Sequence, residues 1–228
     1  MILYAIPAPL GGPAAEALAP AALKIVASLK DFVVENAKSA RALLGELGMP
    51  VRELSIQEIG EDIRPPLQPL REKRPLGLLS EAGCPAVADP GAALVEAAHL
   101  EGFRVVPIVG PSSIMLALMA SGLEGQRFAF CGYLPREPLK RKMRIKELEN
   151  RSLREDETEI FIETPYRNEV LLEALLETCR DTTRLCVAAD LTLPTEAIQL
   201  RTVAGWRRQQ APVGRRPAVF LLLAKTDR

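Results

Sequence analysis

The stretch Leu78-Leu79-Ser80-Glu81-Ala82-Gly83-Cys84-Pro85-Ala86-Val87-Ala88-Asp89-Pro90-Gly91 decides how this chain can fold. It begins inside an apolar run, residues 76–79, that predicts a buried strand. Small residues follow, and Asp89 and Pro90 then predict a helix over residues 92–100, because Asp caps free amides and Pro fits the first helical position. A turn of this kind usually takes about two to six residues, and this one is longer. We therefore expect a ligand loop at the carboxyl end of a strand rather than an ordinary turn.

Length and composition limit the number of domains and the kinds of partner that this chain can have. The chain has 228 residues, 48% of them hydrophobic, which suffices for one large domain or two small ones. Its 29 basic and 29 acidic side chains balance, which argues against bulk coating of nucleic acid but allows a local basic patch. The start lacks the basic lead of a signal peptide and no apolar run reaches a membrane span, so we expect a cytoplasmic protein that does not insert into membranes.

Cysteine and histidine positions give no metal-binding pattern. The cysteines at 84, 131, 179 and 186 form no C-x-x-C pair, and the single histidine, His99, falls in the helix after the loop, where we expect a surface residue. We therefore expect reduced thiols and no metal site.

The first half alternates strands and helices, which favours a parallel sheet. We expect strands over residues 1–6, 31–35, 76–79 and 104–109, helices over 21–29, 39–47 and 92–100, and a surface segment with one helical turn over 55–75. Ser112 or Ser113 should cap a helix over 114–120 that Gly122 ends. A domain boundary is expected near residues 110–124, which gives domains 1–111 and 112–228.

The second half has a different pattern. It predicts strands over residues 127–132, 159–163, 185–189, 197–202 and 218–224, a basic helix over 140–149 and an amphipathic helix over 169–179. Because short links join the last three strands, we expect antiparallel pairing there. The fold class is therefore α/β, with two α/β domains.

Five short motifs resemble the tetrapyrrole methylase superfamily, and within it the bacterial enzymes that methylate a ribose 2′-hydroxyl of small-subunit ribosomal RNA. Any one motif is weak, but their order and spacing together are specific. They are Pro7-Ala8-Pro9-Leu10-Gly11-Gly12, Ser80-Glu81-Ala82-Gly83-Cys84-Pro85 with Asp89-Pro90-Gly91, Gly110-Pro111-Ser112, Gly132-Tyr133-Leu134-Pro135, and Glu163-Thr164-Pro165-Tyr166-Arg167.

Three other motifs of the subgroup are altered. Its E-D-T-R stands here as Glu35-Asn36-Ala37-Lys38, its R-E-L-T-K as residues 189–193, and its G-E-F as Arg216-Pro217-Ala218. The cofactor loops therefore persist while polar positions near the expected acceptor differ.

The resemblance implies S-adenosylmethionine (SAM) as cofactor, in the cleft between the two domains. Small residues such as Gly83 would let the backbone approach a ligand that carries no phosphates. The residues expected to bind it are Pro9, Leu10, Ser80, Gly83, Cys84, Pro85, Ala86, Val87, Asp89, Ser112, Ser113, Ile114, Ile162, Ala189, Pro217 and Ala218; for Ile162 and Ala189 plain core packing is the alternative.

Methyl transfer to a hydroxyl gains from a general base. Glu35 and Glu163 end predicted strands, at the edge where cleft residues lie, and Tyr166 follows Glu163. These three are the candidate catalytic residues. The alternative for the carboxylates is structural: they cap helices or pair with Lys38 and Arg167.

A basic segment, defined by Arg136, Lys140, Arg141, Lys142, Arg144 and Lys146, follows the Gly132-Tyr133-Leu134-Pro135 motif. A charge run is usually a solvated helix face, but here it is a candidate for phosphate contacts with RNA. Three hypotheses remain open: a methyltransferase of structured RNA, a methyltransferase of a tetrapyrrole or other small molecule, and a non-catalytic SAM-binding protein. The resemblance also implies a homodimer.

Overall fold

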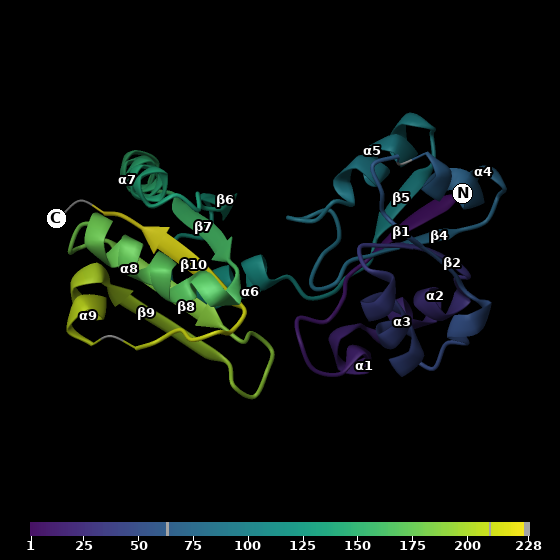
Figure 1. Ribbon diagram of the computed structural model, residues 1–228, viewed down its shortest axis with the longest axis horizontal. Helices are drawn as coiled ribbons and strands as arrows, with labels where there is room; N and C mark the ends of the chain where they lie inside the picture. Colours follow the sequence, from purple (N-terminus) through teal and green to yellow (C-terminus); the bar gives the residue numbers. More distant parts are fainter. Residues whose placement is uncertain (63, 210, 226–228) are drawn as a thin grey trace. The chain divides into compact units, whose positions relative to one another are not determined.

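The apolar runs of the first half form one parallel sheet. The computed structural model describes residues 1–62, 64–209 and 211–225, and the chain divides into two units, Met1–Ser112 (unit 1) and Ser113–Arg228 (unit 2). In unit 1 a five-stranded sheet has the order β3-β2-β4-β1-β5 (Figure 1). Its strands are β1 Ile2–Ile6, β2 Asp31–Val34, β3 Ser55–Glu58, β4 Leu76–Leu79 and β5 Arg104–Pro107, and each adjacent pair is parallel.

Both faces of this sheet are covered, as a parallel sheet requires. Alternate residues of β2 point to opposite sides: Phe32 and Val34 belong to one buried cluster with Leu44, and Val33 belongs to another with Leu94. The helices of unit 1 are α1 Ala14–Ala17, α2 Pro20–Ser28, α3 Ala37–Glu46, α4 Gln68–Arg71 and α5 Ala92–Leu100, with 3₁₀ turns η1 Val51–Glu53 and η2 Pro65–Leu67.

Unit 2 carries a second five-stranded sheet with the order β6-β7-β10-β8-β9. Its strands are β6 Phe128–Tyr133, β7 Thr158–Glu163, β8 Arg184–Ala189, β9 Ala197–Thr202 and β10 Ala218–Leu223. The strands β8, β9 and β10 pair antiparallel, as their short links predict, and only β6–β7 is parallel among the described pairs. The α/β fold class is therefore confirmed in both units.

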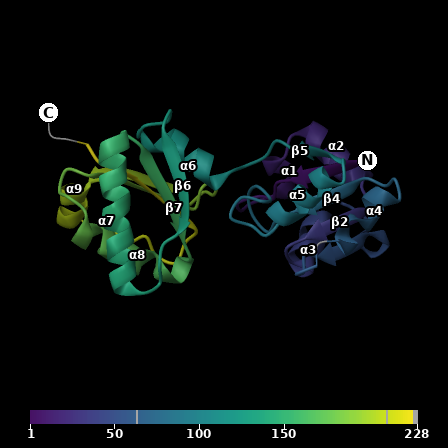
Figure 2. The same ribbon diagram turned by 90° about the horizontal axis from the view of Figure 1, so that it is seen from above.

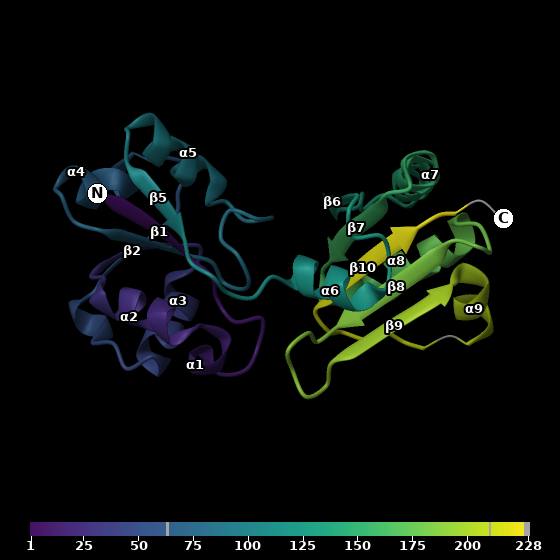
Figure 3. The ribbon, with the colours of Figure 1, turned by 180° about the vertical axis from the view of Figure 1, so that it is seen from behind.

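The helices of unit 2 lie on both faces of its sheet. They are α6 Ser113–Ser121, α7 Pro138–Glu155, α8 Asn168–Thr178 and α9 Val203–Arg208, with the 3₁₀ turn η3 Pro165–Arg167. Helix α6 covers one face (Figure 3), and α7 and α8 pack side by side on the other (Figure 2). The core there includes Phe161 and Phe220, whose rings stack with centroids 6.1 Å apart.

In the part of the chain that the structure describes, one strand and two helices lie outside the predicted set, as do the 3₁₀ turns η1 and η3. Strand β3 occupies Ser55–Glu58, inside the region 55–75 that was expected to be a surface segment with one helical turn, and helices α1 and α9 lie between predicted elements. Helix α7 is also longer than residues 140–149. His99 is exposed, as expected. Among the described residues, no helix is long and apolar enough to cross a membrane, and no group of acidic, cysteine and histidine side chains is arranged to hold a metal ion.

Candidate active site

The carboxyl edge of the unit 1 sheet brings two of the predicted loops together. Strands β1 and β4 are neighbours, so the loops that follow them, residues 7–12 (the first loop) and 80–91 (the central loop), leave the sheet side by side. Ala8 and Gly83 exchange two backbone hydrogen bonds, with N···O distances of 2.9 and 3.0 Å. The two loops therefore form one bonded surface at the place where α/β sheets bind ligands.

Gly83 has a backbone conformation that favours glycine. Its φ is +70°, and a Cβ at this position would lie 3.4 Å from Leu10 Cδ2 and 3.9 Å from the Pro111 carbonyl oxygen. The strain of an L side chain thus arises mainly from φ rather than from a clash. Gly83 therefore lies where the central loop approaches both the first loop, at Leu10, and the segment after β5, at Pro111.

The segment after β5 packs tightly on the first loop. A Cβ on Gly110 would lie 2.6 Å from Pro7 Cβ, so only glycine fits there without a shift. Cys84 Sγ is 3.4 Å from the Pro111 carbonyl oxygen. Burial raises the pKa of the Cys84 thiol, and a hydrogen bond with Ser112 opposes that shift. Ser112 therefore stands beside the central loop, within unit 1.

Asp89 organises the central loop instead of capping a helix, which corrects the prediction made for it. Helix α5 begins at Ala92 with Gly91 as its N-cap residue and without a side-chain cap. Asp89 Oδ1 accepts from the Ala86 and Gly91 amides at 3.2 and 2.8 Å. Ala86 and Ala88 have φ of +65° and +57°, a region that costs non-glycine residues energy. The loop is thus held in a strained conformation by one carboxylate.

Other predicted cofactor residues of unit 1 differ in exposure. Ser80 is buried, and its hydroxyl donates to the Gly83 carbonyl at 2.9 Å, so it supports the loop from within. Pro85 is buried too, Pro9 and Leu10 are half-buried, and Val87 is 45% exposed. Val109, which the sequence did not single out, is 83% exposed in the neighbouring segment. Apolar surface for a ligand is therefore available at this edge.

Acidic side chains gather beside the loop. The Glu81 amide lies 3.4 Å from Glu35 Oε2, and the Ser39 hydroxyl donates to Glu81 Oε1 at 2.6 Å. Glu35 is exposed as a residue, but partial burial of its carboxylate raises its pKa most, and the Asp89 carboxylate beside it raises that pKa further. A raised pKa brings a carboxylate closer to the range in which a general base is effective. Glu81 was not among the predicted site residues. Its position in the motif Ser80-Glu81-Ala82-Gly83-Cys84-Pro85 is the feature of the sequence that could have identified it.

An open pocket of about 230 Å³ adjoins these groups. Its lining comes from the first loop, α3 and the start of the central loop: Pro9, Gly12, Ser39, Ala40, Ala42, Leu43, Glu46, Ser80 and Glu81. Asn36 caps α3 by accepting from the Lys38 and Ser39 amides at 2.9 and 3.2 Å. The replacement of an acidic residue at position 36 thus preserves the helix start.

In unit 2 the predicted residues meet at one end of the sheet. Ala218 of β10 is paired with Glu163 of β7 on one side and with Ala189 of β8 on the other. Ile162 precedes Glu163 and is half-buried, Ala189 is buried, and Pro217 is exposed. Ser113 and Ile114, both half-buried, begin α6.

Glu163, a candidate catalytic residue, lies in an ion pair in this arrangement. It is buried, its Oε2 lies 2.6 Å from Arg167 Nη2, and its Oε1 accepts from the Thr164 amide at 2.8 Å. A carboxylate that is already ion-paired is a poor base, so Glu35 is the better candidate. Tyr166 is 77% exposed, and the Arg215 guanidinium lies 5.3 Å from its ring centroid.

The basic segment is largely compensated by acids elsewhere. Lys142 pairs with Glu177 of α8 at 2.7 Å, and three shorter-range pairs join Lys140–Glu137, Arg144–Glu147 and Lys146–Glu149. Arg141 differs from the other cations of the segment, because it is buried and donates to the Arg136 carbonyl at 3.1 Å. Residues 136–146 contain one acid, Glu137, and the other ion-pair partners lie later in the chain, at Glu147, Glu149 and Glu177.

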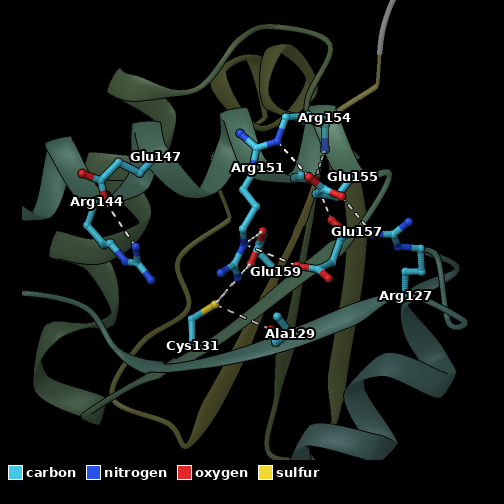
Figure 4. Close-up of polar contacts among 12 residues, drawn as sticks. Arg127, Ala129, Cys131, Arg144, Glu147, Arg151, Arg154, Glu155, Glu157 and Glu159 are labelled. Atoms are coloured by element: carbon cyan, nitrogen blue, oxygen red, sulfur yellow. Dashed lines mark hydrogen bonds and ion pairs between the residues drawn. The ribbon is translucent and has the colours of Figure 1, made fainter.

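A second ionic cluster fastens α7 to the sheet. Figure 4 shows the Arg151 side chain of α7 reaching Glu159 of β7 and Cys131 of β6. Glu159 is fully buried, and the Cys131 thiol donates to its Oε2 at 3.2 Å. Burial, followed by the bond to Glu159, raises the pKa of Cys131 to about 11, so this thiol is not a nucleophile at neutral pH. The cluster holds the edge strand in place.

The two-unit α/β fold, with bonded glycine-containing loops at the carboxyl edge of unit 1, agrees with a family comparison of the sequence. The family model of the Tetrapyrrole (Corrin/Porphyrin) Methylases matches residues 3–205. The chain therefore belongs to this family and is a methyltransferase.

Several relatives are similar in sequence to this chain over most of its length. The chain is 30% identical to Ribosomal RNA small subunit methyltransferase I of Vibrio cholerae over 200 residues, which cover 87% of this chain and 67% of the relative. It is 33% identical to the protein of that name from Xylella fastidiosa over 196 residues, or 85% of this chain and 70% of the relative.

Solved structures share the fold. The methyltransferase CobJ aligns with a TM-score of 0.63 and 21% identity, covering 100% of this chain and 95% of CobJ. Diphthine synthase aligns with a TM-score of 0.67 and 16% identity, covering 100% of this chain and 92% of that protein.

Proposed function

We propose that this protein transfers a methyl group from SAM to a ribose 2′-hydroxyl in RNA of the small ribosomal subunit. The observation that carries the cofactor assignment is the bonded pair of loops at the carboxyl edge of unit 1, with Gly83 at φ +70° where they meet. The acceptor assignment rests on the relatives, which are ribosomal RNA small subunit methyltransferases.

The residues present fit such a cofactor. SAM carries no phosphate, so it requires apolar walls and close backbone approach rather than a glycine-rich phosphate loop. Pro9, Leu10 and Val87 offer apolar surface beside Gly83. The loop amides of Gly83 and Ala86 already bond within unit 1, so the contribution of the loop is its shape and apolar surface. We assign SAM binding in unit 2 to Ile162, Ala189, Pro217 and Ala218.

When bound, SAM supplies a methyl group that its sulfonium activates for displacement. The chain must align the acceptor hydroxyl and accept its proton. We assign the proton to the Glu35 carboxylate, whose pKa is raised by burial and by Asp89. Glu163 holds Arg167 and so shapes η3 instead of serving as the base. A non-catalytic protein is disfavoured, because the relatives are methyltransferases. Asn36 also keeps the start of α3 capped next to Glu35.

Calorimetric titration with SAM tests the cofactor assignment. A valine at position 83 must adopt a left-handed conformation that costs an L residue about 1–2 kcal/mol, so we expect Gly83→Val to weaken binding by about tenfold or more. Gly60→Val is the matched control, because a Cβ there meets nothing within 4 Å. Equal affinities of wild type and Gly83→Val would reduce the loop to a turn, and a wild type that binds no SAM would overturn the proposal.

A further inference from the structure

Two segments of unit 2 that are far apart in the sequence are bonded residue by residue. Asn168 Nδ2 donates to the carbonyl oxygens of Gly214 and Arg216, at 3.0 and 2.7 Å. Glu169 Oε1 accepts from the Gly214 amide at 2.7 Å. The Arg215 guanidinium lies over the Tyr166 ring. The start of α8 and the segment 214–216 therefore form a single clamp, which we call the 168–216 clamp.

Asn168 is the buried centre of this clamp. Asn168 is 0% exposed, and its Oδ1 has no hydrogen-bond partner among the residues that the structure describes. The amide orientation follows from its neighbours, since a flipped amide would set its oxygen against two carbonyl oxygens. A buried acceptor without a partner costs about 1–3 kcal/mol, and the two bonds from Nδ2 to segment 214–216 offset that cost. The free energy of Asn168 therefore depends on holding this segment in place.

The clamp joins the two groups of candidate site residues in unit 2. On one side, the chain runs from Glu163 through Tyr166 directly into Asn168. On the other, segment 214–216 leads into Pro217 and Ala218, and Ala218 is paired with Glu163. The far side of the segment is fastened as well: the Asp190 amide donates to the Pro217 carbonyl at 3.0 Å.

We propose that Asn168 is a positioning residue for methyl transfer: by holding segment 214–216, it sets the place of the Pro217–Ala218 peptide relative to Glu163 and Tyr166. The inference rests on the proposed function, in which Pro217 and Ala218 contribute to SAM binding. A shift of a binding segment by about 1 Å costs up to about 100-fold in rate, so a side chain that never touches the cofactor still determines how well it is held.

A buried residue with an ordinary structural role provides the comparison. Ser152 is also 0% exposed. Its hydroxyl accepts from the Ala224 amide at 2.9 Å and donates to the Glu157 carbonyl at 2.6 Å. Ala224 follows β10 at the end opposite Ala218. Ser152→Ala therefore removes a buried side-chain anchor of the same strand, away from the candidate site.

The experiment measures thermal stability, SAM affinity and steady-state methyl transfer, each well below the Tm of every variant. Asn168→Leu fills the site but donates no hydrogen bond, and we expect the Kd and KM for SAM to rise about 10- to 100-fold. Because distant sites act independently, Ser152→Ala should lower Tm while Kd and KM stay within about twofold of wild type.

The variant Asn168→Asp adds a second measurement, the pH dependence of SAM affinity. A purely structural role of Asn168 would leave this pH dependence as it is in wild type. Burial between two carbonyl oxygens favours the protonated carboxyl, which still donates one hydrogen bond. Rising pH ionises this carboxyl and breaks that bond, so SAM affinity of Asn168→Asp should fall as pH rises, in excess of any change in wild type. Glu169→Ala, at a half-buried position, extends the test to a variant that keeps Asn168 and should also raise the Kd.

The outcomes separate the inference from the proposed function. SAM binding by wild type with unchanged Kd and KM in Asn168→Leu and Glu169→Ala would overturn the positioning role alone. Equal losses of SAM affinity in Asn168→Leu and Ser152→Ala would assign both residues to general stability. A wild type without SAM binding would instead overturn the proposed function itself.

Discussion

Glu35 and Asp89 show how single residues combine structure and chemistry at the carboxyl edge of unit 1. Asp89 bonds two amides of its own loop and also faces Glu35, whose pKa it helps to raise. Glu163, in contrast, ends a strand in the same way but is buried against Arg167. Two carboxylates that look equivalent in sequence therefore have different surroundings, and on that basis we propose the base role for Glu35 alone.

Asp89→Asn should shift the pH dependence of methyl transfer. Asparagine keeps an oxygen for the Ala86 and Gly91 amides but removes the negative charge beside Glu35, so the pKa of Glu35 falls. A base works in its deprotonated form, and the rate is lost as pH falls through that pKa. The acid limb of kcat/KM against pH should therefore move to lower pH. Exposed Glu96→Gln on α5 should leave the profile unchanged, and an unmoved acid limb in Asp89→Asn would refute the coupling.

At the scale of elements, α7 is joined to the rest of unit 2 by a buried carboxylate. Glu149 accepts from the Arg180 amide and the Thr183 hydroxyl, each at 2.6 Å, and from Lys146 at 3.1 Å. Burial alone would raise the pKa of Glu149, but these bonds outweigh it and lower that pKa. The helix is thus fastened to the turn between α8 and β8.

Glu149→Leu should destabilise the protein by about 2–4 kcal/mol, because it leaves buried donors without a partner. Glu147→Gln is the control on the same helix. Its surface pair with Arg144 should contribute less than about 1 kcal/mol. Urea unfolding measures the free energy of unfolding of both variants. Since the folded pKa of Glu149 lies below its unfolded value, its contribution is present above the unfolded pKa and fades as pH falls through the folded one. A destabilisation by Glu149→Leu no larger than that by Glu147→Gln would contradict this account.

The elements that sequence predicts well are those whose signal is local. The central loop and its flanking strand and helix are encoded by consecutive residues, and the antiparallel strands by short links. Strand β3 has only Ile56 as an apolar residue, because it is an edge strand with exposed neighbours, so its pairing with β2 cannot be read from its own pattern. The same limit applies to the site: Arg141 and Lys142 look alike in sequence, and only the fold buries one and pairs the other.

At the scale of the whole molecule, the balanced charge means that the proposed RNA binding depends on local cations. Lys140 and Lys142 are exposed and paired with single glutamates. Such surface pairs are worth at most about 1 kcal/mol and can be exchanged for phosphate. Arg136 is exposed nearby.

The double variant Lys140→Ala, Lys142→Ala should therefore bind RNA more weakly. The slope of log affinity against log salt should flatten by about 0.7 to 0.9 for each phosphate that the variant no longer neutralises. SAM affinity should not change, and Lys24→Ala, an exposed site in unit 1, should alter neither quantity. Filter binding over a salt series measures the slope, and an intact slope in the double variant would remove this surface from the RNA interface.

We also expect the protein to form a homodimer, as the family resemblance implies. Large apolar side chains remain exposed on the described surface of unit 2, among them Met119, Leu139 and Met143, and such surface is typical of interfaces. Light scattering over a concentration series should give twice the mass of 24.9 kDa. A single-chain mass at every concentration would show that these side chains serve another purpose.

The most direct test of the account is methyl transfer from isotopically labelled SAM to a panel of acceptors. The panel contains small ribosomal subunits, their free RNA and porphyrinoid compounds, with Glu35→Gln as the variant. We predict labelling of the ribosomal RNA at a ribose, no labelling of porphyrinoids, and a loss in kcat of about 100-fold or more in Glu35→Gln. Labelling of a porphyrinoid with unlabelled RNA would assign a different acceptor, and no transfer to any acceptor by a protein that binds SAM would contradict the central claim.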